Sequence, residues 1–276
     1  MGHCMEMHVR AIKRALFLFM AVASSASAEQ GVSLNEKPLP PQAQMIDGVM
    51  IPVPNEIFRV LDTFQDTNWN AILRPDLAAL RPEGSTAKIA LSLGLVLGEG
   101  FLAISARDAL AMQDLGRTAI RLSRALGIDN AMLRRQKSVL ESVDRKDWAT
   151  VRKEWSSVSE DLKTAMIEIK SESLSQLISL GGWLRGLEAL SVLASSRYST
   201  PTAQLLRQPV MLDYFSKVVE RMDSPLKEDP VVKATRGGII RLRPLMADQQ
   251  GIAVSQREVL EIRKVSENLI ESLCSQ

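Results

Sequence analysis

Two long apolar segments with glycines inside them constrain the fold of this chain more than any other feature. One runs from Ile89 to Ala106 and carries a single charge, Glu99, and the other runs from Leu174 to Ala194. Their glycines are Gly94, Gly98 and Gly100 in the first segment and Gly181, Gly182 and Gly186 in the second. Each glycine inside a helix costs about 0.5–1 kcal/mol relative to alanine, so a close approach of two backbones must compensate. We therefore predict two buried helices that cross closely through their glycine faces.

Helical periodicity continues almost without interruption through the rest of the chain after residue 85. The clearest case has Asp147 at the N-cap position and an apolar seam with alternating steps of three and four. That seam consists of Trp148, Val151, Trp155, Val158, Leu162, Ala165 and Ile169. We expect the next helix, over 174–195, to be its packing partner. Ser255 followed by Glu258 forms a capping box that opens the last helix.

These patterns predict an all-α fold, a multi-helix bundle or array of about eight or nine helices. We place this single domain at residues 55–276, in which 201–276 could form a semi-independent C-terminal lobe. Residues 29–54 contain five prolines among polar residues, which indicates an extended arm or tether.

The first 28 residues have the organisation of a secretory signal peptide. Basic residues precede a nine-residue apolar run from Ala15 to Ala23, and an A-x-A pattern ends at Ala28. Nine apolar residues fall well short of the about 20 that span a bilayer, so we predict cleavage after Ala28 rather than a membrane anchor. The expected destination is the periplasm of a Gram-negative bacterium, with secretion beyond it also open.

Cleavage after Ala28 would change which chemistries the chain can perform. The leader holds both histidines, His3 and His8, and one of the two cysteines, which leaves Cys274 alone. It also holds three of the 34 basic and one of the 32 acidic residues, so the mature chain has 31 of each and no formal net charge. We therefore expect no intramolecular disulfide, no metal site of the His or Cys type and no catalytic triad with an imidazole base. Composition likewise gives no reason to expect a nucleic-acid partner, and no motif calls for a cofactor.

The ionisable residues of the two apolar segments are the candidate site. If the glycine faces meet, Glu99 and Arg185 could pair, with Glu188 one turn further on. One interpretation is a buried structural ion pair. The other is the polar floor of a small-molecule pocket, in which Arg185 holds an anionic group and Arg107 lines the opening. Because an ionisable group near the middle of each segment is costly in lipid, we expect no stable membrane span after cleavage.

Two functions follow as hypotheses. The first is a non-catalytic protein of the cell envelope that binds a protein partner or a small anionic ligand, and hence is not an enzyme. The second is a carboxylate-dependent hydrolase of the glycan-cleaving type, with Glu99 as its acid. An open cleft around Glu99 would favour the enzyme, whereas a closed ion pair would favour the binding protein.

Overall fold

The computed structural model describes residues 43–46, 49–52, 64, 67–247 and 252–275, in two compact units that divide after Asp66. The expected signal peptide and the predicted cleavage site at Ala28 lie outside the described residues. Within the first unit the structure describes an antiparallel hairpin of β1 (Ala43–Ile46) and β2 (Val49–Pro52), with Ile46 opposite Val49. The hairpin lies within the 29–54 segment that was expected to be an extended arm, and it forms there because Asp-Gly between the strands is the dipeptide that two-residue hairpins favour.

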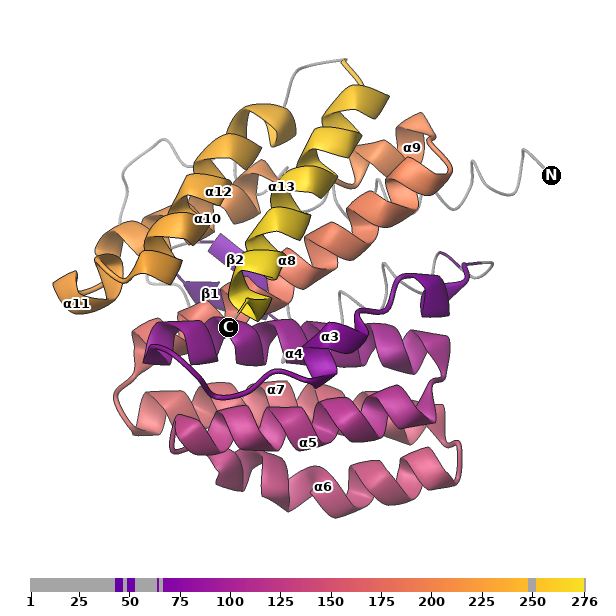
Figure 1. Ribbon diagram of the computed structural model, residues 1–276, viewed down its shortest axis with the longest axis vertical. Helices are drawn as coiled ribbons and strands as arrows, with labels where there is room; N and C mark the ends of the chain where they lie inside the picture. Colours follow the sequence, from indigo (N-terminus) through magenta and orange to yellow (C-terminus); the bar gives the residue numbers. More distant parts are fainter. Residues whose placement is uncertain (1–42, 47–48, 53–63, 65–66, 248–251, 276) are drawn as a thin grey trace, which may run out of the picture. The chain divides into compact units, whose positions relative to one another are not determined.

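All regular elements described in the second unit, Thr67–Gln276, are helical, as the periodicity predicted. Figure 1 shows α4 to α7 stacked side by side, with α8 leading to the C-terminal helices. The long helices are α4 (Thr86–Ala106), α5 (Ala109–Ala125), α6 (Asp129–Asp144), α7 (Trp148–Glu168), α8 (Glu172–Ser196), α10 (Pro209–Arg221), α12 (Pro230–Met246) and α13 (Gln256–Cys274). The short ones are η1 (Trp69–Ala71), α3 (Pro75–Ala78), α9 (Thr200–Gln204) and α11 (Ser224–Lys227). Residues 201–276 belong to this same unit.

Side-chain caps fix where several of these helices begin. Ser85, Asp108 and Asp147 each accept a hydrogen bond from the backbone N–H three residues on, at the starts of α4, α5 and α7. Ser255 and Glu258 form the predicted capping box at the start of α13. These polar residues set the helix boundaries because they satisfy N–H groups that have no partner inside the helix.

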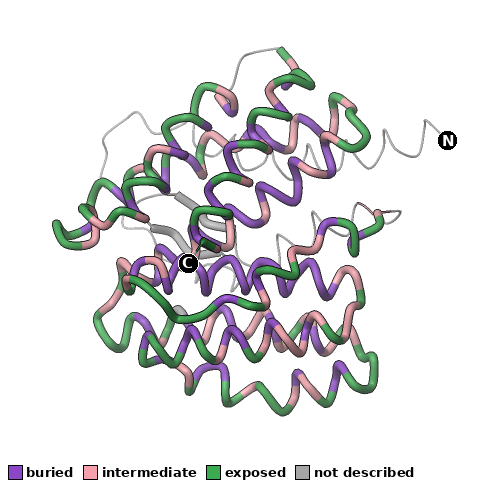
Figure 2. Tube along the Cα trace, viewed as in Figure 1, coloured by how far each residue is buried: buried purple, intermediate pink, exposed green. Residues whose placement is uncertain are grey.

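Helices α4 and α8 are the centre of the unit and pack more extensively on each other than any other described pair. Both are long and apolar enough to cross a membrane by length and composition alone. In the structure, 83% and 72% of those stretches are buried within the protein, as the purple along α4 in Figure 2 shows. The surrounding helices therefore supply the apolar environment that these two sequences require.

One packing prediction was wrong. Helix α7 packs mainly against α6 and much less against α8, which we had expected to be its partner. Its seam residues Val151, Trp155 and Leu162 are buried as the periodicity requires. A seam of alternating threes and fours shows which side of a helix is buried, but it does not identify the helix that covers it.

Candidate functional site

The site is built on a close crossing of α4 and α8. A Cβ atom placed on Gly94 would overlap the carbonyl oxygen of Ile178, and one placed on Gly181 would overlap the carbonyl oxygen of Leu91. At Gly98 it would lie 3.1 Å from the Cβ of Arg185. Backbone therefore touches backbone along this crossing, and the close approach compensates for the conformational cost of glycine.

Other glycines of these segments have different neighbours. Gly100 lies beneath the indole of Trp155 from α7, and that indole donates from Nε1 to the carbonyl oxygen of Leu97 at 3.0 Å. A Cβ on Gly186 would meet nothing within 4 Å, so close packing does not explain that glycine. The crossing thus holds α8 on one side of α4, while α7 closes a neighbouring side.

Glu99 and Arg185 meet where the two helices cross. Arg185 donates from Nε to Oε2 of Glu99 at 2.6 Å, and their side chains are 0% and 3% exposed. The pairing that the sequence suggested is therefore present, and it is closed to solvent.

The remaining nitrogens of Arg185 are also used. Nη1 donates to Glu188 and Nη2 donates to the carbonyl oxygen of Ile72 at 2.7 Å. The second oxygen of Glu99 accepts from the backbone N–H of Arg74 at 2.5 Å. The cluster therefore joins α4, α8 and the segment 72–74 through both partners of the ion pair.

Burial dominates the electrostatics of this core cluster of Glu99, Arg185 and Glu188. Desolvation raises the pKa of Glu99, and Arg185 together with the N–H of Arg74 opposes that rise. Desolvation also raises the pKa of Glu188, against the attraction of Arg185 and Arg74. One guanidinium faces two carboxylates, so the fully ionised cluster carries one uncompensated negative charge, which a low-dielectric site disfavours.

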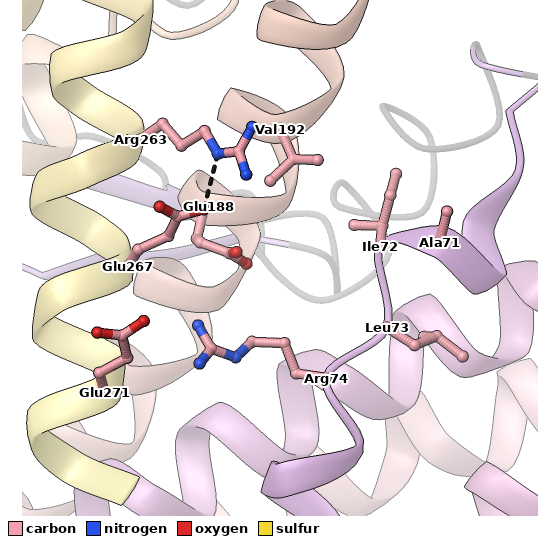
Figure 3. Close-up of a pocket in the computed structure, with 9 residues that line it drawn as sticks. All are labelled: Ala71, Ile72, Leu73, Arg74, Glu188, Val192, Arg263, Glu267 and Glu271. Atoms are coloured by element: carbon pink, nitrogen blue, oxygen red, sulfur yellow. Dashed lines mark hydrogen bonds and ion pairs between the residues drawn. The ribbon is translucent and has the colours of Figure 1, made fainter.

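An open groove with a cavity of about 270 Å³ lies against this cluster (Figure 3). Residues of the segment 71–74, of α8 and of α13 line it. They are Ala71, Ile72, Leu73, Arg74, Glu188, Val192, Arg263, Glu267 and Glu271. Glu188 belongs to both features, because it binds Arg185 on its buried side and lines the groove. The dashed line in Figure 3 marks the pair between Arg263 and Glu267, 2.7 Å apart.

The sequence-based candidates divide between these places. Glu99, Arg185 and Glu188 come together, but Arg107 does not join them. It is the exposed C-cap of α4, in left-handed conformation at a φ of 53°, two turns beyond Glu99. Arg185 is fully buried and each of its side-chain nitrogens donates to the protein, so an anionic ligand does not reach its guanidinium.

Four charged residues of the groove are not among those that the sequence singles out: Arg74, Arg263, Glu267 and Glu271. Arg263, Glu267 and Glu271 repeat every four residues on α13, and this spacing is the one sequence signal that marks them. Arg74 lies in an irregular segment without periodicity, so no sequence pattern marks it. Among the described residues, no group of three or more His, Cys, Asp or Glu side chains is arranged to hold a metal ion.

Comparison of the chain with protein-family models, with curated proteins and with solved structures finds no match.

Proposed function

We propose that this chain is exported to the periplasm, cleaved after Ala28, and acts there as a non-catalytic binding protein. The observation that supports it is the contrast between the closed core cluster and the open groove beside it. Both carboxylate oxygens of Glu99 accept hydrogen bonds, and the residue as a whole is 2% exposed. A general acid must reach its substrate, whereas this carboxyl is committed to the protein.

The groove supplies what a binding site needs. It is a concave space lined mainly by polar surface, with the apolar residues Ile72 and Val192 among its charged groups. At about 270 Å³ it falls near the lower end of the volumes that hold small ligands. The proposal therefore assigns ligand recognition to the groove and structural support to the cluster.

Filling the groove provides the test for binding. We would screen polar small molecules against the mature chain by thermal shift, alongside Val192→Trp, which places a large ring in the cavity, and Ile240→Trp on the exposed side of α12 as the matched control. We expect compounds that raise the Tm of the wild type and of Ile240→Trp but not that of Val192→Trp. A screen without any stabilising compound, or one in which Val192→Trp responds like the wild type, would contradict the proposal.

The hydrolase hypothesis has one observation in its favour, the raised pKa of Glu99. It predicts that the wild-type chain digests peptidoglycan and that Glu99→Gln does not. We expect neither protein to release fragments. Digestion by the wild type that is lost in a folded Glu99→Gln variant would replace the binding proposal with a catalytic one.

Export has its own test. The protein recovered from the periplasm of a Gram-negative host should begin at Glu29 when its N-terminus is sequenced. Replacing Ala26 with leucine should block cleavage, because the peptidase that removes signal peptides requires small side chains at the last and third-last positions of the leader. Recovery of the uncleaved chain from the cytoplasm would contradict this part of the proposal.

A further inference from the structure

The groove presents charges of both signs from three separate segments. Helix α13 contributes Arg263, Glu267 and Glu271 in one row, and α8 contributes Glu188 opposite them. The guanidinium of Arg74 enters from the segment 71–74 and points toward α13 in Figure 3. A ligand in this space would therefore meet acceptors and donors of opposite charge at the same time.

The charges that line the groove do not cancel. Three carboxylates face two guanidiniums, so the lining carries one excess negative charge. Both guanidiniums are also engaged, Arg263 with Glu267 at 2.7 Å and Arg74 with Asp76 at 3.2 Å. Within the described part of the chain Glu271 takes part in no ion pair, which leaves its carboxylate available to a ligand.

The spacing of the carboxylates points to an organic ligand rather than a metal ion. Among the described residues no three acidic side chains lie close enough together to hold one metal ion, and this includes Glu188, Glu267 and Glu271. A molecule that carries its positive charges some distance apart can satisfy separated carboxylates, and each such hydrogen bond is charge-assisted. The apolar side chain of Val192 would then lie against the hydrocarbon between those charges.

We propose that the groove binds a basic α-amino acid, a small molecule with two ammonium groups and one carboxylate. Its single net positive charge matches the excess negative charge of the lining. Its ammonium groups would bind the carboxylates of Glu267 and Glu271, which are the more exposed acids of the lining, and its carboxylate would bind the guanidinium of Arg74. This assignment rests on the proposed binding function and names its ligand class.

Four probes of closely similar length separate the contributions. Isothermal titration of the mature chain would use lysine, 1,5-diaminopentane without the carboxylate, 6-aminohexanoate without the α-ammonium group, and glutamate with the opposite net charge. We expect lysine to bind most tightly, each analogue that lacks one group to bind about tenfold more weakly, and glutamate to show no binding.

Variants locate the binding in the groove. Glu271→Gln should weaken lysine about tenfold, and Arg74→Gln should weaken lysine but not 1,5-diaminopentane, whose two positive charges lose a repelling neighbour. The matched control is Glu261→Gln, on the exposed side of the same helix and outside the lining, which should bind lysine as the wild type does. Far-ultraviolet circular dichroism and Tm would show that each variant is folded.

The outcomes distinguish this inference from the proposed function. No heat with lysine, glutamate binding as tightly as lysine, or equal loss in Glu261→Gln and Glu271→Gln would overturn the ligand class. If lysine fails while other compounds in the thermal-shift screen depend on Val192, the binding function stands and the ligand is of another kind. If both experiments fail, neither proposal survives.

Discussion

Two arginines in this protein each bind two carboxylates, one in the core and one near the surface. In the core cluster, Arg185 is 0% exposed and holds Glu99 and Glu188. In the second, which we call the surface cluster, Arg135 of α6 is 31% exposed and holds Glu154 and Asp161 of α7, at 3.0 and 2.7 Å. The same three charges thus occur in two different dielectric environments.

The difference between these environments decides what each cluster can contribute. Near the surface, water screens the charges, and hydrogen bonds to Asp161 and Glu154 raise the pKa of Arg135 against a modest burial penalty. In the core, desolvation is the largest influence on both carboxylates and raises their pKa values. The surface cluster therefore adds a small attraction between two helices, whereas the core cluster tolerates the loss of a partner very poorly.

The largest expected effect comes from removing each arginine in turn. Arg185→Met leaves two buried carboxylates without their cation and should destabilise the protein by about 3–5 kcal/mol. Arg135→Met should cost about 1 kcal/mol or less, because solvent can reach both carboxylates. Urea unfolding followed by circular dichroism measures both values. Similar losses for the two variants would show that burial does not separate the clusters.

The next largest effect is expected at the close crossing of α4 and α8 beside the core cluster. Helices α6 and α7, which carry the surface cluster, contain no glycine and form no such crossing. Gly94→Ala should destabilise the protein by about 1–3 kcal/mol, because its Cβ would overlap the carbonyl oxygen of Ile178. Gly186→Ala on α8 is the matched control and should stabilise by about 0.5–1 kcal/mol, since its Cβ meets nothing within 4 Å. Thermal unfolding of the two variants checks the opposite signs. A neutral Gly94→Ala would mean that α4 and α8 can separate at little cost.

The smallest expected effect concerns pH. Burial raises the folded-state pKa of Glu188 above its ordinary value of 4.5, so the folded protein binds this proton more tightly than the unfolded chain does. The resulting stability is fully present below pH 4.5 and is lost as the pH rises through the folded pKa. Glu188→Gln keeps an acceptor for Arg185 and removes the titration, so its stability should fall less steeply above pH 4.5. Urea unfolding at several pH values compares the slopes, and equal slopes would show that Glu188 does not titrate differently in the folded protein.

The sequence predicted the core of this arrangement because its signals are local. Glycines four residues apart and a lone carboxylate within an apolar helix indicated a close crossing and a buried pair, and the capping residues indicated where helices begin. The partner of α7 and the groove could not be predicted in this way. They depend on which helices become neighbours in space. Arg74 and Glu271 line the same groove although they lie near opposite ends of the second unit's sequence.

The hydrogen bond from Arg185 to the carbonyl oxygen of Ile72 spans 113 positions of the sequence, whereas Glu99 reaches the N–H of Arg74 across 25. A growing chain therefore makes the buried acid long before the cation that neutralises it. Until α8 has been synthesised, α4 carries a carboxylate that has no countercharge to bury with, and the loop that supplies one is long and slow to close. Such an order of events keeps the centre of the protein open until late in synthesis. If the chain is exported as proposed, this delay is an advantage, because an exported polypeptide must remain unfolded while it crosses a membrane.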